Sequence, residues 1–212
     1  MKLKLKLDSF TGGLLETNAY LLNAPEGAIL FDAPEGAAKW VDQMLGQGAR
    51  KLAHVLLTHG HYDHTLDAAK LKRKHGCRVW IHADSAPLLE HPESMAAFSP
   101  YPVMEGVKDH QAVPETEAFE ISGLTFRTLL CPGHCPGSIC FYLPEEAWCV
   151  GGDVLFSGGV GRWDLPGGSF EDLQRSIRRK LYSLPDATKV FPGHGPATTI
   201  GAEKRSNPFI PE

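Results

Sequence analysis

The chain lacks both a long apolar run and an excess of positive charge. No stretch approaches the roughly 20 consecutive apolar residues that a membrane-spanning helix needs, and residues 2–7 alternate Lys and Leu, unlike the apolar core of a signal peptide. The 212 residues carry 21 Lys and Arg against 25 Asp and Glu, for a formal net charge of −4. This balance gives no basic footprint for nucleic acid. We therefore expect neither a membrane nor a nucleic-acid partner.

Cysteine is scarce as well. There are five cysteines, an odd number without the spacing of a disulfide framework, which favours a reducing compartment and a cytoplasmic location. The composition is otherwise that of an ordinary globular protein, with 42% hydrophobic and 22% charged residues. A chain of this length fits one generous domain over residues 1–212.

Short β-type segments separated by helical ones predict an α/β fold. The expected strands are 3–7, 19–22, 28–31, 53–58, 78–81, 119–121, 124–126, 139–143 and 148–150. The expected helices are 37–45, 65–75, 85–90 and a segment that begins after Ser169, with apolar residues at helical spacing as far as Leu184. The rest of 83–115 is expected to be a connecting loop. This order indicates two sheets packed face to face with helices outside, an αββα sandwich.

Seven His and Asp side chains follow the ends of four apolar runs. They are His59, His61, Asp63, His64, His134, Asp153 and His194. Imidazole and carboxylate are ligands that divalent zinc, iron and manganese accept. His59 and His61 are two residues apart, so an extended segment points both the same way. Glycine and proline on both sides of His134 and His194 predict tight, defined loops there.

Two simpler interpretations compete with a metal centre. A single Gly-His loop is more often a surface feature, but four such sites at strand ends make that interpretation improbable. A purely structural zinc site is disfavoured because such sites usually close a tetrahedron with cysteine-rich ligands, and seven ligands are too many for one. The pattern therefore predicts two divalent metal ions, with zinc favoured and iron or manganese as alternatives.

The run from His59 to His64, followed by downstream His, Asp and His, resembles the H-x-H-x-D-H signature of the metallo-β-lactamase superfamily. Segments 132–138, 152–156, 161–164, 193–199 and 203–209 are similar to the glyoxalase II (hydroxyacylglutathione hydrolase) branch, especially its short bacterial members. The resemblance implies an αββα sandwich with a dinuclear site at one edge. Full-length glyoxalase II enzymes add a C-terminal helical domain, and the 18 residues after His194 are too few for it.

The resemblance also implies how the ligands divide. One metal would take His59, His61 and His134. The other would take Asp63, His64 and His194. Asp153 would bridge the two metals together with a water or hydroxide, which Asp63 would orient.

We expect hydrolysis of a small-molecule thioester, with an S-acylglutathione as the substrate that the resemblance implies. A thiol leaves as a thiolate with a pKa of about 8.5, so no strong general acid is needed. Substrate contacts are expected from Arg162, Trp163, Lys204 and Arg205, because arginine binds carboxylates in a bidentate manner; ordinary surface charge is the alternative. Asp32 ends an apolar run and is a candidate acceptor for a ligand histidine N–H, with an exposed turn as its alternative.

Three other functions stay open. A persulfide dioxygenase would use a single iron, held by the equivalents of His59, His134 and Asp153. A lactonase or esterase would use the same hydroxide on another ester. A non-catalytic metal-binding protein is the third, and the intact ligand set speaks against it. The sequence does not predict the oligomeric state.

Overall fold

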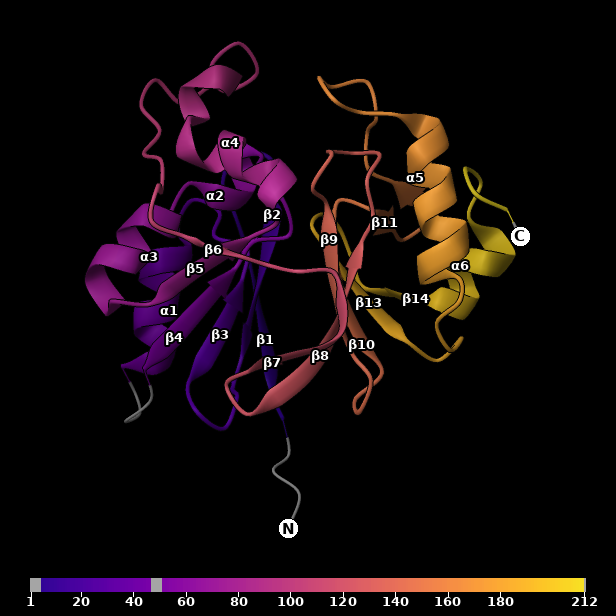
Figure 1. The fold of residues 1–212 in the computed structure, drawn as a ribbon, viewed down its shortest axis with the longest axis horizontal. Helices are drawn as coiled ribbons and strands as arrows, with labels where there is room; N and C mark the ends of the chain where they lie inside the picture. Colours follow the sequence, from indigo (N-terminus) through magenta and orange to yellow (C-terminus); the bar gives the residue numbers. More distant parts are fainter. Residues whose placement is uncertain (1–4, 47–50, 212) are drawn as a thin grey trace. The chain divides into compact units, whose positions relative to one another are not determined.

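The computed structural model describes residues 5–46 and 51–211 (Figure 1). Contacts within the chain divide it into two compact units. Unit 1 comprises Met1–Val113 with Glu120–Leu124, and unit 2 comprises Pro114–Phe119 with Thr125–Glu212. Among the described residues, no helix has the length and apolar character of a membrane span. That residues 1–212 fold as one domain stays a prediction.

The sheet of unit 1 has the strand order β1-β2-β3-β4-β5-β6. Its strands are β1 (Leu7–Gly12), β2 (Thr17–Leu22), β3 (Ala28–Phe31), β4 (Leu52–Leu56), β5 (Arg78–Ile81) and β6 (Gln111–Ala112). The first three strands pair antiparallel, and pairing from β3 to β6 is parallel. Parallel neighbours need crossover connections, which helices commonly supply.

The helices of unit 1 are α1 (Ala37–Leu45), α2 (Tyr62–Thr65), α3 (Ala68–His75) and α4 (Ala86–Glu90), with 3₁₀ turns η1 (Ala83–Ser85) and η2 (Pro92–Met95). Helices α1 and α3 make the crossovers from β3 to β4 and from β4 to β5 (Figure 1). Val41 of α1 and Leu71 of α3 pack in one core with Leu30 and Val55 of the sheet, and all four side chains are fully buried. This core fixes the strand β4 whose end carries the first predicted ligands.

The sheet of unit 2 has the order β14-β13-β10-β9-β8-β7. Its strands are β7 (Thr116–Ile121), β8 (Leu124–Leu130), β9 (Ile139–Leu143), β10 (Trp148–Gly152), β13 (Lys189–Pro192) and β14 (Thr198–Thr199). A small hairpin of β11 (Leu155–Phe156) and β12 (Gly159–Val160) follows β10. The loops after β8, β10 and β13 each carry one predicted ligand.

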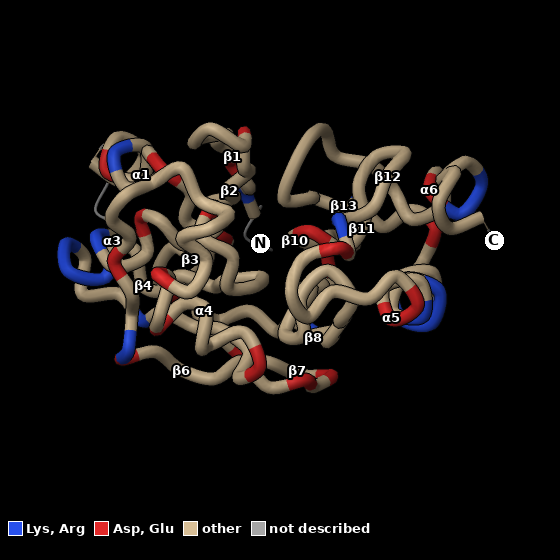
Figure 2. Tube along the Cα trace, turned by 90° about the horizontal axis from the view of Figure 1, so that it is seen from above, with Lys and Arg blue, Asp and Glu red and all other residues tan. Residues whose placement is uncertain are grey.

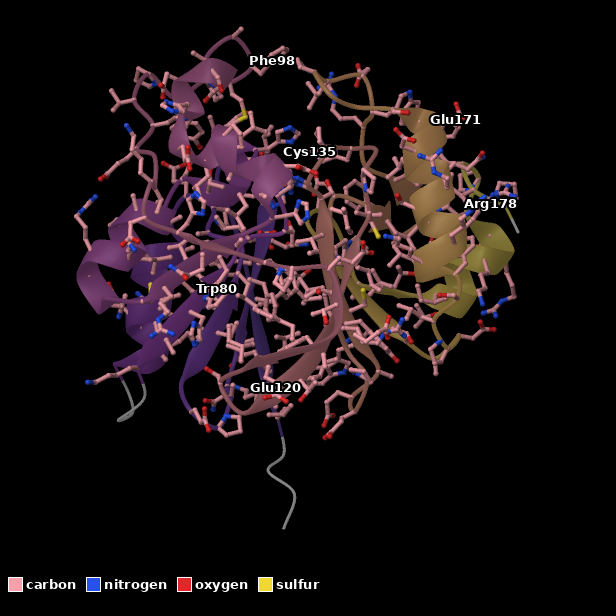
Figure 3. All side chains as sticks on the ribbon, in the orientation of Figure 1. Trp80, Phe98, Glu120, Cys135, Glu171 and Arg178 are labelled. Atoms are coloured by element: carbon pink, nitrogen blue, oxygen red, sulfur yellow. The ribbon has the colours of Figure 1, made fainter. Side chains whose placement is uncertain are left out.

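Two helical segments complete unit 2. Helix α5 (Phe170–Ser176) continues into the π-helical turn η3 (Ile177–Leu181), and α6 (Ile200–Ser206) follows β14. The Ser169 hydroxyl caps α5 by accepting the Asp172 N–H at 3.2 Å. Leu173 and Ile177 are fully buried against the sheet, whereas Glu171 and Arg178 are exposed on the outer side (Figure 3). This amphipathic pattern confirms the helix expected after Ser169.

The expected segments 28–31, 37–45, 78–81 and 139–143 coincide with the observed elements. The first strand was expected at 3–7, of which residues 3 and 4 lie outside the described part, and β1 instead begins at Leu7. The expectation of one helix over 65–75 is wrong, because Asp67 leaves the helical conformation and its carboxylate accepts the Ala38 N–H at 2.9 Å. The expected loop within 83–115 also contains η2 and β6, and neither α6 nor the β11–β12 hairpin was predicted.

Candidate metal centre

The loop after β4 brings two predicted ligands together. His59 follows β4 by a few residues and is almost fully buried. His61 has an extended backbone, with φ −63° and ψ 144°. The Nε2 atom of His59 lies 3.1 Å from Nδ1 of His61. The pairing expected from their spacing of two is therefore present within unit 1.

Helix α2 carries a second pair. His64 Nε2 lies 3.3 Å from Asp63 Oδ2. The buried Thr17, from β2, donates its hydroxyl to the same Asp63 oxygen at 2.8 Å. A strand distant in sequence thus holds the carboxylate in place beside the imidazole.

The carboxylate of Asp32 forms hydrogen bonds with Thr58, which precedes His59, and with His64. Asp32 is buried and has a positive φ of 56°, a conformation that non-glycine residues adopt only with strain. Its oxygens accept the backbone N–H and the hydroxyl of Thr58, each at 2.8 Å, and Nδ1 of His64 at 2.8 Å. The Thr58 hydroxyl oxygen also lies 3.1 Å from Nδ1 of His59. The expected hydrogen bond, in which Asp32 accepts from a predicted ligand histidine, is therefore present, and it directs Nε2 of His64 towards Asp63.

In unit 2, Asp153 lies between the two other predicted histidines. Its Oδ2 atom is 3.6 Å from Nε2 of His134 and 3.3 Å from Nε2 of His194. Asp153 follows β10, where the register with β13 shifts between Val150 and Gly152. This irregularity at the strand end aims the carboxylate towards two neighbouring loops.

The ring of His134 is oriented by a backbone group. Its Nδ1 lies 2.7 Å from the carbonyl oxygen of Arg162. Because a carbonyl only accepts, Nδ1 carries the proton and Nε2 is left to face Asp153. The chain passes very close here, since a Cβ atom on Gly161 would lie 1.9 Å from the Asp153 carbonyl oxygen. Only glycine fits at that position without moving the backbone.

Gly133, next to His134, has a similar constraint. Its φ is 135°, and a Cβ there would lie 2.2 Å from the backbone nitrogen of Leu173 on α5. The Gly-His sequence is therefore a packing requirement of the loop against the helix as well as a turn signal.

The chemistry of the donors fits divalent metal ions. Within unit 1, His59 lies beside His61 and Asp63 beside His64, and within unit 2 Asp153 lies beside His134 and His194. Nδ1 of His64 and Nδ1 of His134 each have an acceptor, which fixes the tautomer as is usual for metal-ligating histidines. Nitrogen and oxygen donors of this kind suit zinc, iron and manganese.

The predicted substrate residues are partly engaged within the chain. Arg162 forms a bidentate pair with Asp164 at 2.8 and 3.0 Å, and Lys204 Nζ lies 2.8 Å from Asp186 Oδ1. Arg205 lies in the basic last turn of α6, which is blue in Figure 2. Trp163 is 37% exposed, and its ring centroid lies 4.7 Å from that of Phe170. Of these residues, Trp163 presents the clearest apolar contact surface.

The sequence interpretation missed several partners. Thr17 and Thr58 were not singled out, although Thr58 directly precedes His59 and could have been noticed for that reason. The Arg162 carbonyl has no sequence signal, because any residue supplies one.

Comparison with known proteins places this architecture in a family. The sequence profile described as "Metallo-beta-lactamase superfamily" matches residues 12–194. The chain belongs to the metallo-β-lactamase superfamily. The fold class expected from the sequence is thereby confirmed, and the protein is a metallo-hydrolase of that superfamily.

Three similar proteins are informative. The hydroxyacylglutathione hydrolase GloC of Haemophilus influenzae is 40% identical over 187 residues, which cover 87% of this chain and 88% of that protein. The BLEG-1 B3 metallo-β-lactamase has a TM-score of 0.89 at 34% identity, with 97% of this chain and 99% of that chain covered. TTHA1623, whose crystal structure is of a di-iron-bound form, has a TM-score of 0.87 at 37% identity, with 96% and 100% covered.

Proposed function

We propose that the protein hydrolyses a small-molecule thioester, of the S-acylglutathione type, at a centre of two divalent metal ions. His59, His61 and His134 would hold one ion, and Asp63, His64 and His194 the other. Asp153 would bridge them. The observation that carries the proposal is the position of Asp153 Oδ2, which lies 3.6 Å from His134 Nε2 and 3.3 Å from His194 Nε2, one residue of each set.

The contacts within unit 1 support the same division of the ligands between two ions. The pair His59–His61 and the pair Asp63–His64 are separate close contacts, at 3.1 and 3.3 Å. Each pair would supply two ligands to one ion, and His134 and His194 would each add one more. Zinc is the ion we propose, with iron and manganese as competitors. When bound, such ions lower the pKa of water to about 7 and polarise a carbonyl group.

The protein's own contribution is to hold and orient. Thr17 fixes the Asp63 carboxylate, which we propose orients the attacking water. Asp32 and the Arg162 carbonyl hold the protons of His64 and His134 on Nδ1, away from the reacting groups. The leaving thiolate, with a pKa of about 8.5, needs no general acid, so a site built from ligands alone suffices for a thioester.

The identity of the acyl carrier has separate support. The Haemophilus relative is named as a hydroxyacylglutathione hydrolase and is 40% identical. We propose that Trp163 contacts the carrier with its exposed ring, and that Arg162, Lys204 and Arg205 attract carrier carboxylates. Arg162 and Lys204 would have to share their charge with Asp164 and Asp186, so their contribution is smaller than that of unpaired cations. A reducing cytoplasm as the site of action fits the five buried cysteines that form no disulfide, Cys77, Cys131, Cys135, Cys140 and Cys149.

The test is turnover of S-lactoylglutathione by metal-loaded protein, beside a simple aryl ester and a chromogenic cephalosporin. We expect the thioester to have the highest kcat/KM. The kcat/KM of the Asp153→Asn variant should fall by more than the about 10–100-fold that follows loss of a group that only orients a metal ligand. Glu171→Gln, on the exposed side of α5, is the matched control and should keep wild-type rates.

Other outcomes would overturn the thioester assignment. A thioester rate no better than that of the aryl ester would remove glutathione and favour a general esterase or lactonase. Preference for the cephalosporin would make the chain a lactamase like its BLEG-1 neighbour. A single iron per chain, with oxygen uptake on glutathione persulfide, would identify a persulfide dioxygenase.

A further inference from the structure

A buried carboxylate lies outside the ligand set, on α6 of unit 2. Glu203 is 2% exposed, which is unusual for a glutamate. Its Oε2 accepts the Gly158 N–H at 3.0 Å and the side-chain amide of Asn207 at 2.8 Å. Its Oε1 accepts the Thr198 hydroxyl at 2.5 Å. Such burial is tolerated because both oxygens are hydrogen-bonded, and it ties three segments to one side chain.

Asn207 extends this network to the same hairpin. Its side-chain amide also donates to the Gly159 carbonyl at 3.0 Å. Its Oδ1 accepts the N–H groups of Phe209 and Ile210, at 3.0 and 3.2 Å. Gly158 lies in the turn of the β11–β12 hairpin, and Gly159 begins β12, where it pairs with Phe156. The tip is therefore held by side chains of a helix that lies more than forty residues later in the chain.

The hairpin leads directly into the backbone that orients His134. Strand β12 ends at Val160, Gly161 packs against the Asp153 backbone, and the Arg162 carbonyl accepts from His134 Nδ1 at 2.7 Å. Only Gly161 separates the end of β12 from this acceptor. A shift of the hairpin would move the acceptor and free the imidazole to exchange tautomers or rotate.

We propose that Glu203 is a positioning residue for His134. By holding the hairpin tip, it keeps the Arg162 carbonyl where it fixes the proton of His134 on Nδ1 and presents Nε2 beside Asp153. The consequence for metal affinity rests on the proposed function. The consequence for the imidazole does not, because it concerns hydrogen bonds within unit 2 alone.

Two substitutions of Glu203 separate the loss of its hydrogen-bond acceptor from the loss of its negative charge. Glu203→Ala removes the acceptor of the Gly158 N–H and one of the two acceptors of the Asn207 side-chain amide. Glu203→Gln can keep an oxygen at the Oε2 position and turn its NH₂ towards Thr198, whose hydroxyl both donates and accepts. Ser206→Ala, on the exposed side of α6, is the matched control.

The first measurement is ¹⁵N NMR of the imidazoles in metal-free, folded protein. Wild type, Glu203→Gln and Ser206→Ala should show His134 as one tautomer protonated at Nδ1. Glu203→Ala should show averaged or exchanging His134 signals. The second measurement is zinc affinity by competition with a chromophoric chelator. We expect about 10–100-fold weaker binding for Glu203→Ala and about twofold or less for the other two variants.

A folded Glu203→Ala protein with the wild-type His134 tautomer and zinc affinity would overturn the proposal, since Glu203 would then stabilise the fold only. If Glu203→Ala does not fold, Glu203→Asp takes its place: the shorter side chain withdraws the acceptor from Gly158, and an unchanged His134 signal would again refute the role. If wild type binds no zinc but Glu203→Ala still alters the His134 signal, the proposed function fails and the positioning role stands.

Discussion

At the scale of single residues, the ligand imidazoles are oriented by neighbours within their own unit. Asp32 accepts from Nδ1 of His64, and the Arg162 carbonyl accepts from Nδ1 of His134. Each contact places the proton on Nδ1, so that Nε2 of His64 faces Asp63 and Nε2 of His134 faces Asp153. The folded chain thus orients the nitrogens that we propose as metal ligands, which would lower the cost of reorganisation on metal binding.

Replacing Asp32 by asparagine tests whether Asp32 orients the imidazole of His64 for metal binding. Asparagine tolerates a positive φ and keeps the shape, but its NH₂ only donates. In place of Oδ2 it would face two donors, the Thr58 hydroxyl and His64 Nδ1, and in place of Oδ1 it would face the Thr58 N–H. We expect metal affinity to fall about 10–100-fold with the circular dichroism spectrum unchanged. Asp84→Asn, at a carboxylate that is 60% exposed, is the control. Equal affinities in the two variants would show that Asp32 does not orient His64.

A pH effect on stability is expected at His54. Burial first, and then the charge of Arg78, lowers the pKa of His54 below its usual 6.5. The neutral ring accepts the Trp80 indole N–H at 3.0 Å. The unfolded state then binds more protons, so the stability contributed by neutral His54 is complete above pH 6.5 and is lost as pH falls through the folded pKa.

Thermal unfolding between pH 7.5 and 5 measures this effect. We expect the wild-type melting temperature to fall further than that of His54→Gln, in which no imidazole titrates. Parallel curves for the two proteins would mean that His54 is protonated in the folded state without cost.

At the scale of elements, close packing sets the course of the loops that carry ligands. Gly161 has no room for a side chain beside Asp153, and Gly133 has none beside α5. The loops that carry His134 and Asp153 are therefore fixed by contacts with neighbouring backbone.

Gly161→Ala is expected to displace the Arg162 carbonyl, because its Cβ would lie 1.9 Å from the Asp153 carbonyl oxygen. The variant should lose both unfolding free energy and metal affinity. Gly76→Ala is a useful comparison. Gly76 has a positive φ of 63°, but a Cβ atom added there would meet no other atom within 4 Å. It should lose only the about 1–2 kcal/mol of a left-handed alanine and keep its metal affinity. Chemical denaturation and chelator competition give the two quantities; equal losses of both would refute the clash at Gly161.

Elements with strong local signals were predictable, and others were not. The buried strand 28–31 and the amphipathic helix 37–45 have clear patterns and were predicted at their observed bounds. The break at Asp67 depends on a tertiary hydrogen bond to Ala38, which no local pattern reveals. Helix α6 has only seven residues, although its cap, with Thr199 accepting the Ala202 N–H, was readable in principle.

At the scale of the whole molecule, membership of the metallo-β-lactamase superfamily makes this chain a metallo-hydrolase. The sequence was sufficient for the fold class, because strand ends and Gly-Pro loops have visible patterns, and the ligand set read from the same patterns stays a prediction. It was insufficient for the orienting groups, since a backbone carbonyl at Arg162 and the buried Glu203 acquire their roles only through folding. The proposed substrate contact Trp163 has its ring beside that of Phe170 and also beside that of Phe209, which lies far along the chain, so its surroundings arise only through folding.

The central claim is that the seven His and Asp residues bind a pair of metal ions. Metal content of chelator-free protein, measured by mass spectrometry for wild type, His61→Ala of unit 1 and His194→Ala of unit 2, tests it most directly. We predict two ions per wild-type chain and fewer in each variant. A wild-type chain that takes up no divalent ion, or a content unchanged by either substitution, would contradict the claim.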